Sequence, residues 1–167
     1  MNDYELTLHY SIIPLYKGEN LFRWVIGCFA SFYEGTPFNH VWLSVKNKSG
    51  EMICVDLSGY DLSMNYNELK IYYSILKELK FNLTKEEYES VIDKIKSLKD
   101  VKYSYLKIVV LLLNRKFGTK FLFDKYDSTS TEIIARILKS IDEKYYLDYP
   151  QLCGLKELET YYKENSL

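Results

Sequence analysis

Cysteine is scarce in this chain of 167 residues, and its three cysteines, Cys28, Cys54 and Cys153, lie far apart. They form no CxxC pair and no metal-ligand cluster. We therefore expect no metal site and no cofactor. The odd number of cysteines favours a reducing compartment.

Long apolar runs are also missing. The longest, LKIVVLLL at 106–113, is far shorter than the roughly 20 residues that span a bilayer. The N-terminal stretch MNDYELTLHY lacks the basic region and apolar run of a signal peptide. The sequence thus predicts a soluble, cytoplasmic protein without a transmembrane segment, with delivery by a virion or another secretion route left open.

Neither sign of charge is in excess, since the formal net charge is −1. Nothing in this balance points to nucleic acid or to an anionic membrane surface as a partner. The chain is 47% hydrophobic and 27% charged, a composition that can build a core. Its length favours a single domain over residues 1–167, and the sequence shows no repeats and no linker between domains.

The first part of the chain is rich in strand signals. Segment 6–16 has a high content of β-forming residues and predicts a first strand. Segment 20–35 has apolar residues at helical spacing and a glycine at its end, which predicts a helix. Segment 39–59 predicts two strands joined by the turn KNKSG, a β-hairpin.

The second part of the chain is rich in helix signals. Residues 83–100 predict a helix that begins with a capping box formed by Thr84 and Glu87. Segment 69–81 fits a strand and a helix equally. Further helices are expected at 104–118, as a buried helix, at 130–142 and at 155–164. Strands early and helices late favour the α+β class.

His40 is the first residue that could carry chemistry. It lies in TPFNHVWLSV, where alternation puts His40, Trp42 and Ser44 on one face of the expected strand. A histidine at the start of a strand can be held rigidly and aimed sideways. On pattern alone, a half-exposed histidine without a chemical role is the simpler interpretation.

Asp56 is the second such residue, in the segment MICVDLSG. In the expected hairpin it lies on the strand next to His40. A carboxylate in that place can accept the imidazole N–H, fix its tautomer and stabilise the imidazolium. Taken alone, an aspartate that starts a turn at the end of a strand is the simpler interpretation.

Ser130 is the third, in the hydroxyl-rich stretch DSTST that opens the helix 130–142. The first turn of a helix has unpaired N–H groups and the positive end of the helix dipole. A nucleophile there is stabilised, and a nearby N–H can donate to an oxyanion. Serine is also a preferred N-cap, so a cap is the simpler interpretation of Ser130 alone.

Together the three residues change the interpretation, because histidine, acid and then nucleophile at a helix start is an acyl-transfer arrangement. FNHVWLSV resembles the histidine strand of the circularly permuted papain-like proteins related to NlpC-type cysteine peptidases and amidases, in their YiiX-like branch. STEIIARIL resembles their nucleophile helix, and VKYSYLKIVVLLL resembles a segment whose tyrosine, here Tyr103, lies near the nucleophile. The resemblance runs from about residue 10 to residue 140, and the order and spacing of the motifs carry it.

The resemblance implies an α+β fold of the permuted papain-like type, in which a small antiparallel sheet, formed by the histidine strand and its neighbours, packs against helices. It implies a nucleophile at residue 130, His40 as general base and then acid, and Asp56 as the residue that orients His40. Tyr103 and the helix amides near residue 130 would support the oxyanion. VDLSG, which contains Asp56, stands where many members carry a glutamate or another polar residue.

The departure from the family is at residue 130, which is serine where the family has the nucleophilic cysteine. Three interpretations stay open: a form inactivated by a Cys-to-Ser change, a natural serine enzyme, and a natural non-enzyme that kept the fold. The first is favoured because His40, Asp56 and Tyr103 all remain in place. None of the three cysteines opens a helix, so each is interpreted as structural.

The sequence therefore predicts a papain-like hydrolase that cleaves an amide or isopeptide bond of a peptide-type substrate through a covalent acyl intermediate. One alternative is a lipid acyltransferase or hydrolase resembling lecithin retinol acyltransferase. Another is a binding module on the same fold without chemistry. The expected partners are a peptide, isopeptide or acyl substrate, with specificity in the loops 58–68 and 114–127.

Overall fold

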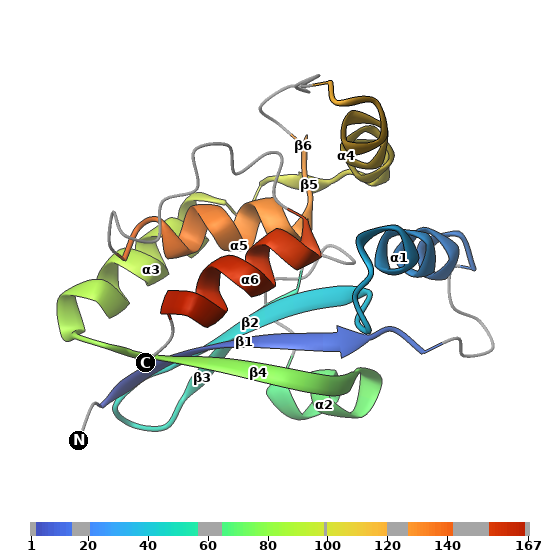
Figure 1. Cartoon of the computed structure of the whole chain (residues 1–167). Helices are drawn as coiled ribbons and strands as arrows, with labels where there is room; N and C mark the ends of the chain where they lie inside the picture. Colours follow the sequence, from blue (N-terminus) through green and yellow to red (C-terminus); the bar gives the residue numbers. More distant parts are fainter. Residues whose placement is uncertain are drawn as a thin grey trace.

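The computed structural model describes residues 3–14, 21–56, 65–98, 100–119, 127–141 and 154–165. Within them, four antiparallel strands form an open sheet in the order β3-β2-β1-β4 (Figure 1). The strands are β1 (Tyr4–Ile12), β2 (His40–Lys46), β3 (Met52–Val55) and β4 (Ser74–Leu83). The class is thus mixed α+β, as the order of the sequence patterns predicts.

The hairpin predicted at 39–59 is present as β2 and β3, which pair antiparallel from Leu43 opposite Val55 to Lys46 opposite Met52. Gly50 lies in its turn at a φ of 85°, a conformation that side chains with a Cβ rarely adopt. On its other side β2 pairs with β1, and His40 lies opposite Ser11. His40 is therefore the first residue of an inner strand.

Six helices lie in the described part of the chain: α1 (Leu21–Glu34), α2 (Tyr66–Tyr72), α3 (Lys85–Ser97), α4 (Tyr105–Phe117), α5 (Ser130–Leu138) and α6 (Leu155–Asn165). A short parallel pair, β5 (Lys102–Tyr103) and β6 (Asp127–Ser128), joins the starts of α4 and α5. The capping box of Thr84 and Glu87 is confirmed at the start of α3. Segment 69–81, which fitted two structures, contains both: α2 ends within it and β4 begins.

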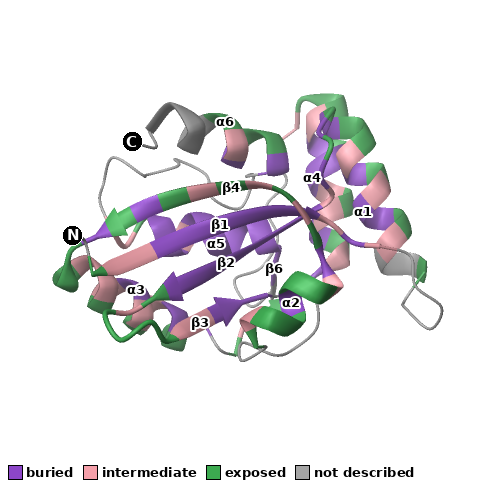
Figure 2. Ribbon diagram, turned by 90° about the horizontal axis from the view of Figure 1, so that it is seen from below, coloured by how far each residue is buried: buried purple, intermediate pink, exposed green. Residues whose placement is uncertain are grey.

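Helices α3, α5 and α6 lie on one face of the sheet, and the short helix α2 lies at one end of the other face (Figures 1 and 2). Val41, Leu43 and Val45 of β2 belong to the large core, together with apolar residues of α3, α5 and α6. Trp42 lies in a smaller core on the opposite face, with Leu69 and Tyr73 from the α2 layer. The alternation predicted for this strand is confirmed, and it puts His40 on the α2 side.

The helix predicted to be buried at 104–118 is only partly so. The helix in this segment, α4, is capped at its C-terminal end by Gly118, as expected, and Gly118 has a left-handed conformation with a φ of 64°. However, Leu106, Val109 and Leu113 on one side of α4 are exposed. The reason is position, since α1 and α4 lie beyond the end of the sheet where β1 ends and β2 begins, and none of the helices and strands that the structure describes lies over their outer sides (Figure 2).

The described helices include none with the length and apolar character needed to cross a bilayer. Likewise, no group of three or more histidines, cysteines and carboxylates within the described ranges is placed to hold a metal ion.

A second histidine is buried inside the sheet. His9 of β1 lies between Ser44 of β2, at 2.8 Å from its Nε2, and Glu78 of β4, at 2.9 Å from its Nδ1. Its ring stacks on Trp42 with the centroids 3.8 Å apart. Burial lowers the pKa of His9 from 6.5 to about 4, against the raising effect of Glu78. This serine, histidine and glutamate are arranged like a triad, but Ser44 is only 1% exposed in mid-strand, so they join three strands instead of meeting a substrate.

The His9 site predicts a pH dependence of stability. Between pH 6.5 and about 4, the unfolded chain binds a proton at residue 9 that the folded chain does not. The free energy of unfolding therefore falls as the pH falls through this window, by up to about 3 kcal/mol from this residue.

We expect His9→Gln, whose amide can bond both neighbours, to lose this contribution. Urea unfolding at intervals from neutral pH downwards should then give a shallower loss of stability in the variant than in the unchanged chain. If the free energy of unfolding of the two proteins depends equally on pH above the range where carboxylates titrate, the pH dependence does not come from His9.

Candidate active site

The site begins with a buried pair at one end of the sheet. His40 Nε2 lies 2.9 Å from Asp56 Oδ1, and both side chains are buried. Asp56 follows the last residue of β3, and the β2–β3 register brings it beside the start of β2. The predicted contact between these two residues is present in the structure.

Tyr73 is the third member of this group, and no pattern in the sequence predicts it. Its hydroxyl donates a hydrogen bond to Asp56 Oδ2 at 2.5 Å, so both carboxylate oxygens are engaged. The Tyr73 ring also lies 4.8 Å from the His40 ring. Tyr73 comes from the C-cap of α2, in the segment whose structure the sequence left undecided, so no pattern placed it near Asp56.

The bond to Asp56 determines which nitrogen of His40 can act as a base. An ionised carboxylate only accepts hydrogen bonds, so Nε2 carries the proton that it donates to Asp56. Nδ1 then keeps the free lone pair. In this arrangement Nδ1 of His40 can accept a proton, and Asp56 can stabilise the charge that the imidazole would gain.

Ser130 is the first residue of α5, but it is not the helix cap. Thr129 has the extended backbone of an N-cap, and its hydroxyl accepts the N–H of Glu132 at 3.2 Å. The simpler interpretation of Ser130 as the cap is therefore wrong. Because Thr129 satisfies the helix start, the Ser130 hydroxyl is not required for capping.

One pocket brings the predicted residues together. His40, Tyr103 and Ser130 all line it, and Asp56 lies behind His40. The remaining wall is mostly apolar and is made by Ile26 and Ala30 of α1 and by Ile108 and Leu111 of α4, with Leu155 from α6. Its cavity of about 40 Å³ holds a few water molecules or a slim chemical group.

Tyr103 reaches this pocket through the short β5–β6 pair. Its strand partner is Ser128, two residues before Ser130, so the pairing aligns the starts of α4 and α5. Its ring meets that of Tyr105 edge to face at 4.9 Å. Tyr103 therefore lies at the same pocket as Ser130, the residue that the resemblance places near it.

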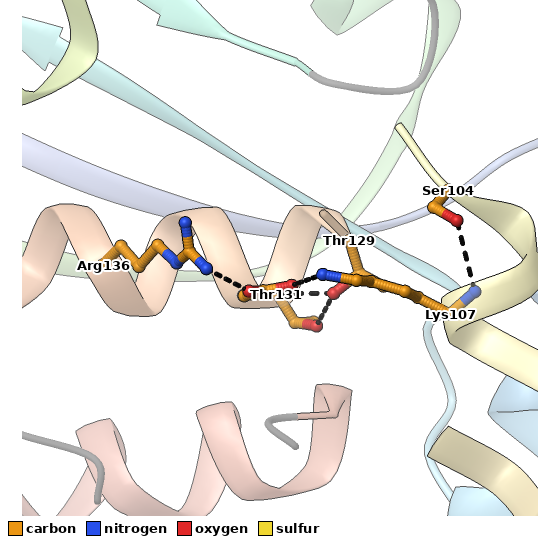
Figure 3. A network of polar contacts seen from close by, with 6 residues as sticks. Ser104, Lys107, Thr129, Thr131 and Arg136 are labelled. Carbon is orange, nitrogen blue, oxygen red and sulfur yellow. Dashed lines mark hydrogen bonds and ion pairs between the residues drawn. The ribbon is translucent and has the colours of Figure 1, made fainter. Parts of the chain in front are cut away.

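A buried ionic network holds the start of α5 against α4 (Figure 3). Glu132, which is fully buried, accepts from Lys107 Nζ at 3.3 Å and from Arg136 at 2.5 Å. Its carboxylate in the first turn also favours the positive end of the helix dipole. Separating such a buried pair would leave an uncompensated charge, which is unfavourable. The pair of Lys107 with Glu132 therefore keeps the start of α5, with residue 130, close to the start of α4, which follows Tyr103.

A second ionic group closes the far end of the pocket. Glu34 at the end of α1 pairs with Arg115 of α4 at 3.0 Å and accepts the N–H of Lys156 in α6 at 3.0 Å. Arg115 also pairs with Glu157. Burial raises the pKa of the Glu34 carboxyl, while the Arg115 guanidinium acts in the opposite direction. This group fixes α1, α4 and α6 to one another and frames the pocket.

The cysteines keep their structural interpretation where the structure describes them. Cys54 is buried in the small core with Trp42, and burial, with a further contribution from Asp56, raises the pKa of its thiol to about 11. Cys28 lies in α1, where its sulfur accepts a weak hydrogen bond from Asn39 at 3.8 Å. Cys153 lies outside the described residues, as do 58–64 and 120–126 of the predicted specificity loops.

Comparisons of the chain with protein-family models, with curated proteins and with solved structures found no match. The function of the site therefore has to follow from its residues and their geometry.

The hydrogen bond from Tyr73 to Asp56 is testable by itself. Tyr73→Phe removes a buried bond to a charged acceptor, which typically contributes about 1.5–3 kcal/mol. We expect urea unfolding at neutral pH to give a free energy of unfolding lower by about 2 kcal/mol. Tyr66→Phe, in the same helix layer, is the control and should change little; equal effects of the two substitutions would refute the special role of Tyr73.

Proposed function

We propose that the chain is an acyl-transfer hydrolase of the permuted papain-like type, which cleaves an amide or isopeptide bond through a covalent intermediate at residue 130. One observation supports this above all: His40, oriented by Asp56, and Ser130 at the start of α5 line the same pocket. Neither residue is explained by packing alone, since a histidine, a carboxylate and a hydroxyl are all buried at this one end of the sheet.

In this proposal the side chain of residue 130 attacks the substrate carbonyl. His40 Nδ1 accepts the proton of the nucleophile as the bond to carbon forms, and Asp56 stabilises the imidazolium. The carbonyl oxygen gains negative charge and is met by N–H groups of the first turn of α5, at the positive end of the helix dipole. Tyr103, in the pocket wall, would add a polar group on the same side.

The intermediate then breaks down in two steps. The imidazolium of His40 gives its proton to the leaving amine, the C–N bond breaks, and an acyl group stays on residue 130. A water molecule, deprotonated by the same Nδ1, attacks the acyl carbon and releases the acid. Residue 130 recovers its proton from His40, so the site returns to its starting state.

The serine at residue 130 limits this chemistry. A thiol is already partly ionised near neutral pH and is intrinsically a strong nucleophile, whereas a hydroxyl must lose its proton to His40 as it attacks. We therefore assign efficient turnover to the form with cysteine at residue 130, and weak or no turnover to the form with serine.

An alternative with the same chemistry is transfer or hydrolysis of a lipid acyl group. The apolar walls contributed by α1 and α4 favour it, because an acyl chain needs no hydrogen-bonding partners there. A binding module without chemistry remains the third possibility, and the experiment below separates it from the other two.

The test is covalent labelling of Ser130→Cys by an acyl probe that reacts with activated thiols. We expect rapid labelling at residue 130, and mass spectrometry of the intact chain measures its rate. The unchanged chain is the background control, because Cys54 has a thiol pKa of about 11 and should react slowly at neutral pH.

A His40→Ala substitution in the Ser130→Cys background should lower the labelling rate by about two orders of magnitude or more, the size of a typical general-base contribution. Thr131→Cys places a thiol in the same pocket one residue further on and is the matched positional control. If residue 130 labels no faster than residue 131, or labels equally fast without His40, the chain is not an enzyme of this kind.

A further inference from the structure

The outer side of α1 and α4 is an apolar surface that no element of the described residues covers. Phe32, the most exposed of its aromatic residues, is 86% exposed, and Val25 and Phe29 continue the stripe along α1. Leu106, Val109 and Leu113 form a parallel stripe on α4. Contiguous apolar surface of this kind marks a binding site more often than chance exposure.

Between the two stripes runs a groove of about 250 Å³. Its walls are Val25, Ile26, Phe29 and Tyr33 on α1, and Val109, Leu112, Leu113 and Lys116 on α4. Its lining spans nine residues of α1, from Val25 to Tyr33, and at about 1.5 Å per step this makes the groove about 12 Å long. Among the described residues of its lining, only Lys116 is charged, and its ammonium lies over the ring of Phe117, 5.6 Å from the centroid.

The groove lies against the catalytic pocket. Ile26 lines both, so the outer groove adjoins, at this side chain of α1, the cavity lined by His40 and Ser130. The two helices run in the same direction, because the end of α1 at Glu34 pairs with the end of α4 at Arg115. A chain that leaves the pocket past Ile26 would therefore run along both helices towards Lys116.

We propose that this groove binds a single aliphatic chain belonging to the substrate, with the reactive carbonyl in the pocket and the chain along α1 and α4. That this aliphatic chain belongs to the substrate rests on the proposed function. That the groove binds an aliphatic chain does not rest on it. A methylene chain has no polar groups that would need hydrogen-bonding partners. It therefore suits the described walls, which are mostly apolar and include Lys116 as their charged residue. Because Ile26 lines both the groove and the pocket, a slim chain that can occupy both fits this lining better than a helix, which could lie only on the outside.

Fluorescence titration with cis-parinaric acid, a fatty acid that fluoresces in apolar surroundings, tests the groove directly. We expect saturable binding to the unchanged chain. Leu113→Glu places a carboxylate in the groove and should weaken binding about tenfold or more, because a charge next to a methylene chain loses its water. Val25→Glu tests the opposite wall and should act in the same direction.

The matched control is Leu76→Glu on β4. Leu76 is 50% exposed and Leu113 is 46% exposed, so the two substitutions add the same charge at equally open positions. The proposal is overturned if the unchanged chain does not bind the probe, or if Leu76→Glu weakens binding as much as Leu113→Glu. It is also overturned if Leu113→Glu only converts a dimer to a monomer, since a second copy would then be the occupant.

The two proposals fail separately. Binding of the fatty acid to the chain with serine at residue 130 requires no catalysis, so it can succeed where the labelling of Ser130→Cys fails. If both succeed, the fatty acid should slow labelling of Ser130→Cys, and Leu113→Glu should relieve that inhibition. If the bound fatty acid leaves the labelling rate unchanged, the aliphatic chain that the groove binds does not belong to the substrate.

Discussion

The hydrogen bond between His40 Nε2 and Asp56 Oδ1 is the contact on which the proposed chemistry depends. It joins the first residue of β2 to the residue that follows β3, and it leaves Nδ1 of the imidazole as the basic nitrogen. Tyr73 holds the other carboxylate oxygen, so the orientation of the aspartate is itself constrained. A base with a defined nitrogen and direction results from three residues that lie far apart in the sequence.

The rest of the structure places residue 130 at the same pocket. Thr129 caps α5 and so relieves Ser130 of that function, while Glu132, buried between Lys107 and Arg136, holds the first turn against α4. Since α4 also packs beside α1, the pocket wall and the outer apolar groove are two sides of one helix pair. The position of the proposed nucleophile and the proposed path of an aliphatic chain are therefore set by the same helices.

Strong local signals in the sequence predicted much of this arrangement. The hairpin, the capping box of α3, the glycine at the end of α4 and the α+β class follow from patterns within short windows, and so does the pairing of His40 with Asp56. Tyr73 and the Ser44–His9–Glu78 group did not follow, because they depend on contacts between distant strands and helices. The exposure of α4 was missed because its apolar composition fits a core helix and a binding surface equally well.

The most direct test of the account is the tautomer of each histidine, read from long-range ¹⁵N–¹H NMR spectra of the labelled chain at neutral pH. The chain has two histidines, and their partners predict opposite states. His9 should carry its proton on Nδ1, which donates to Glu78, whereas His40 should carry it on Nε2, which donates to Asp56. A neutral His40 protonated on Nδ1 would contradict the account, because the nitrogen proposed to take the proton of residue 130 would already hold one.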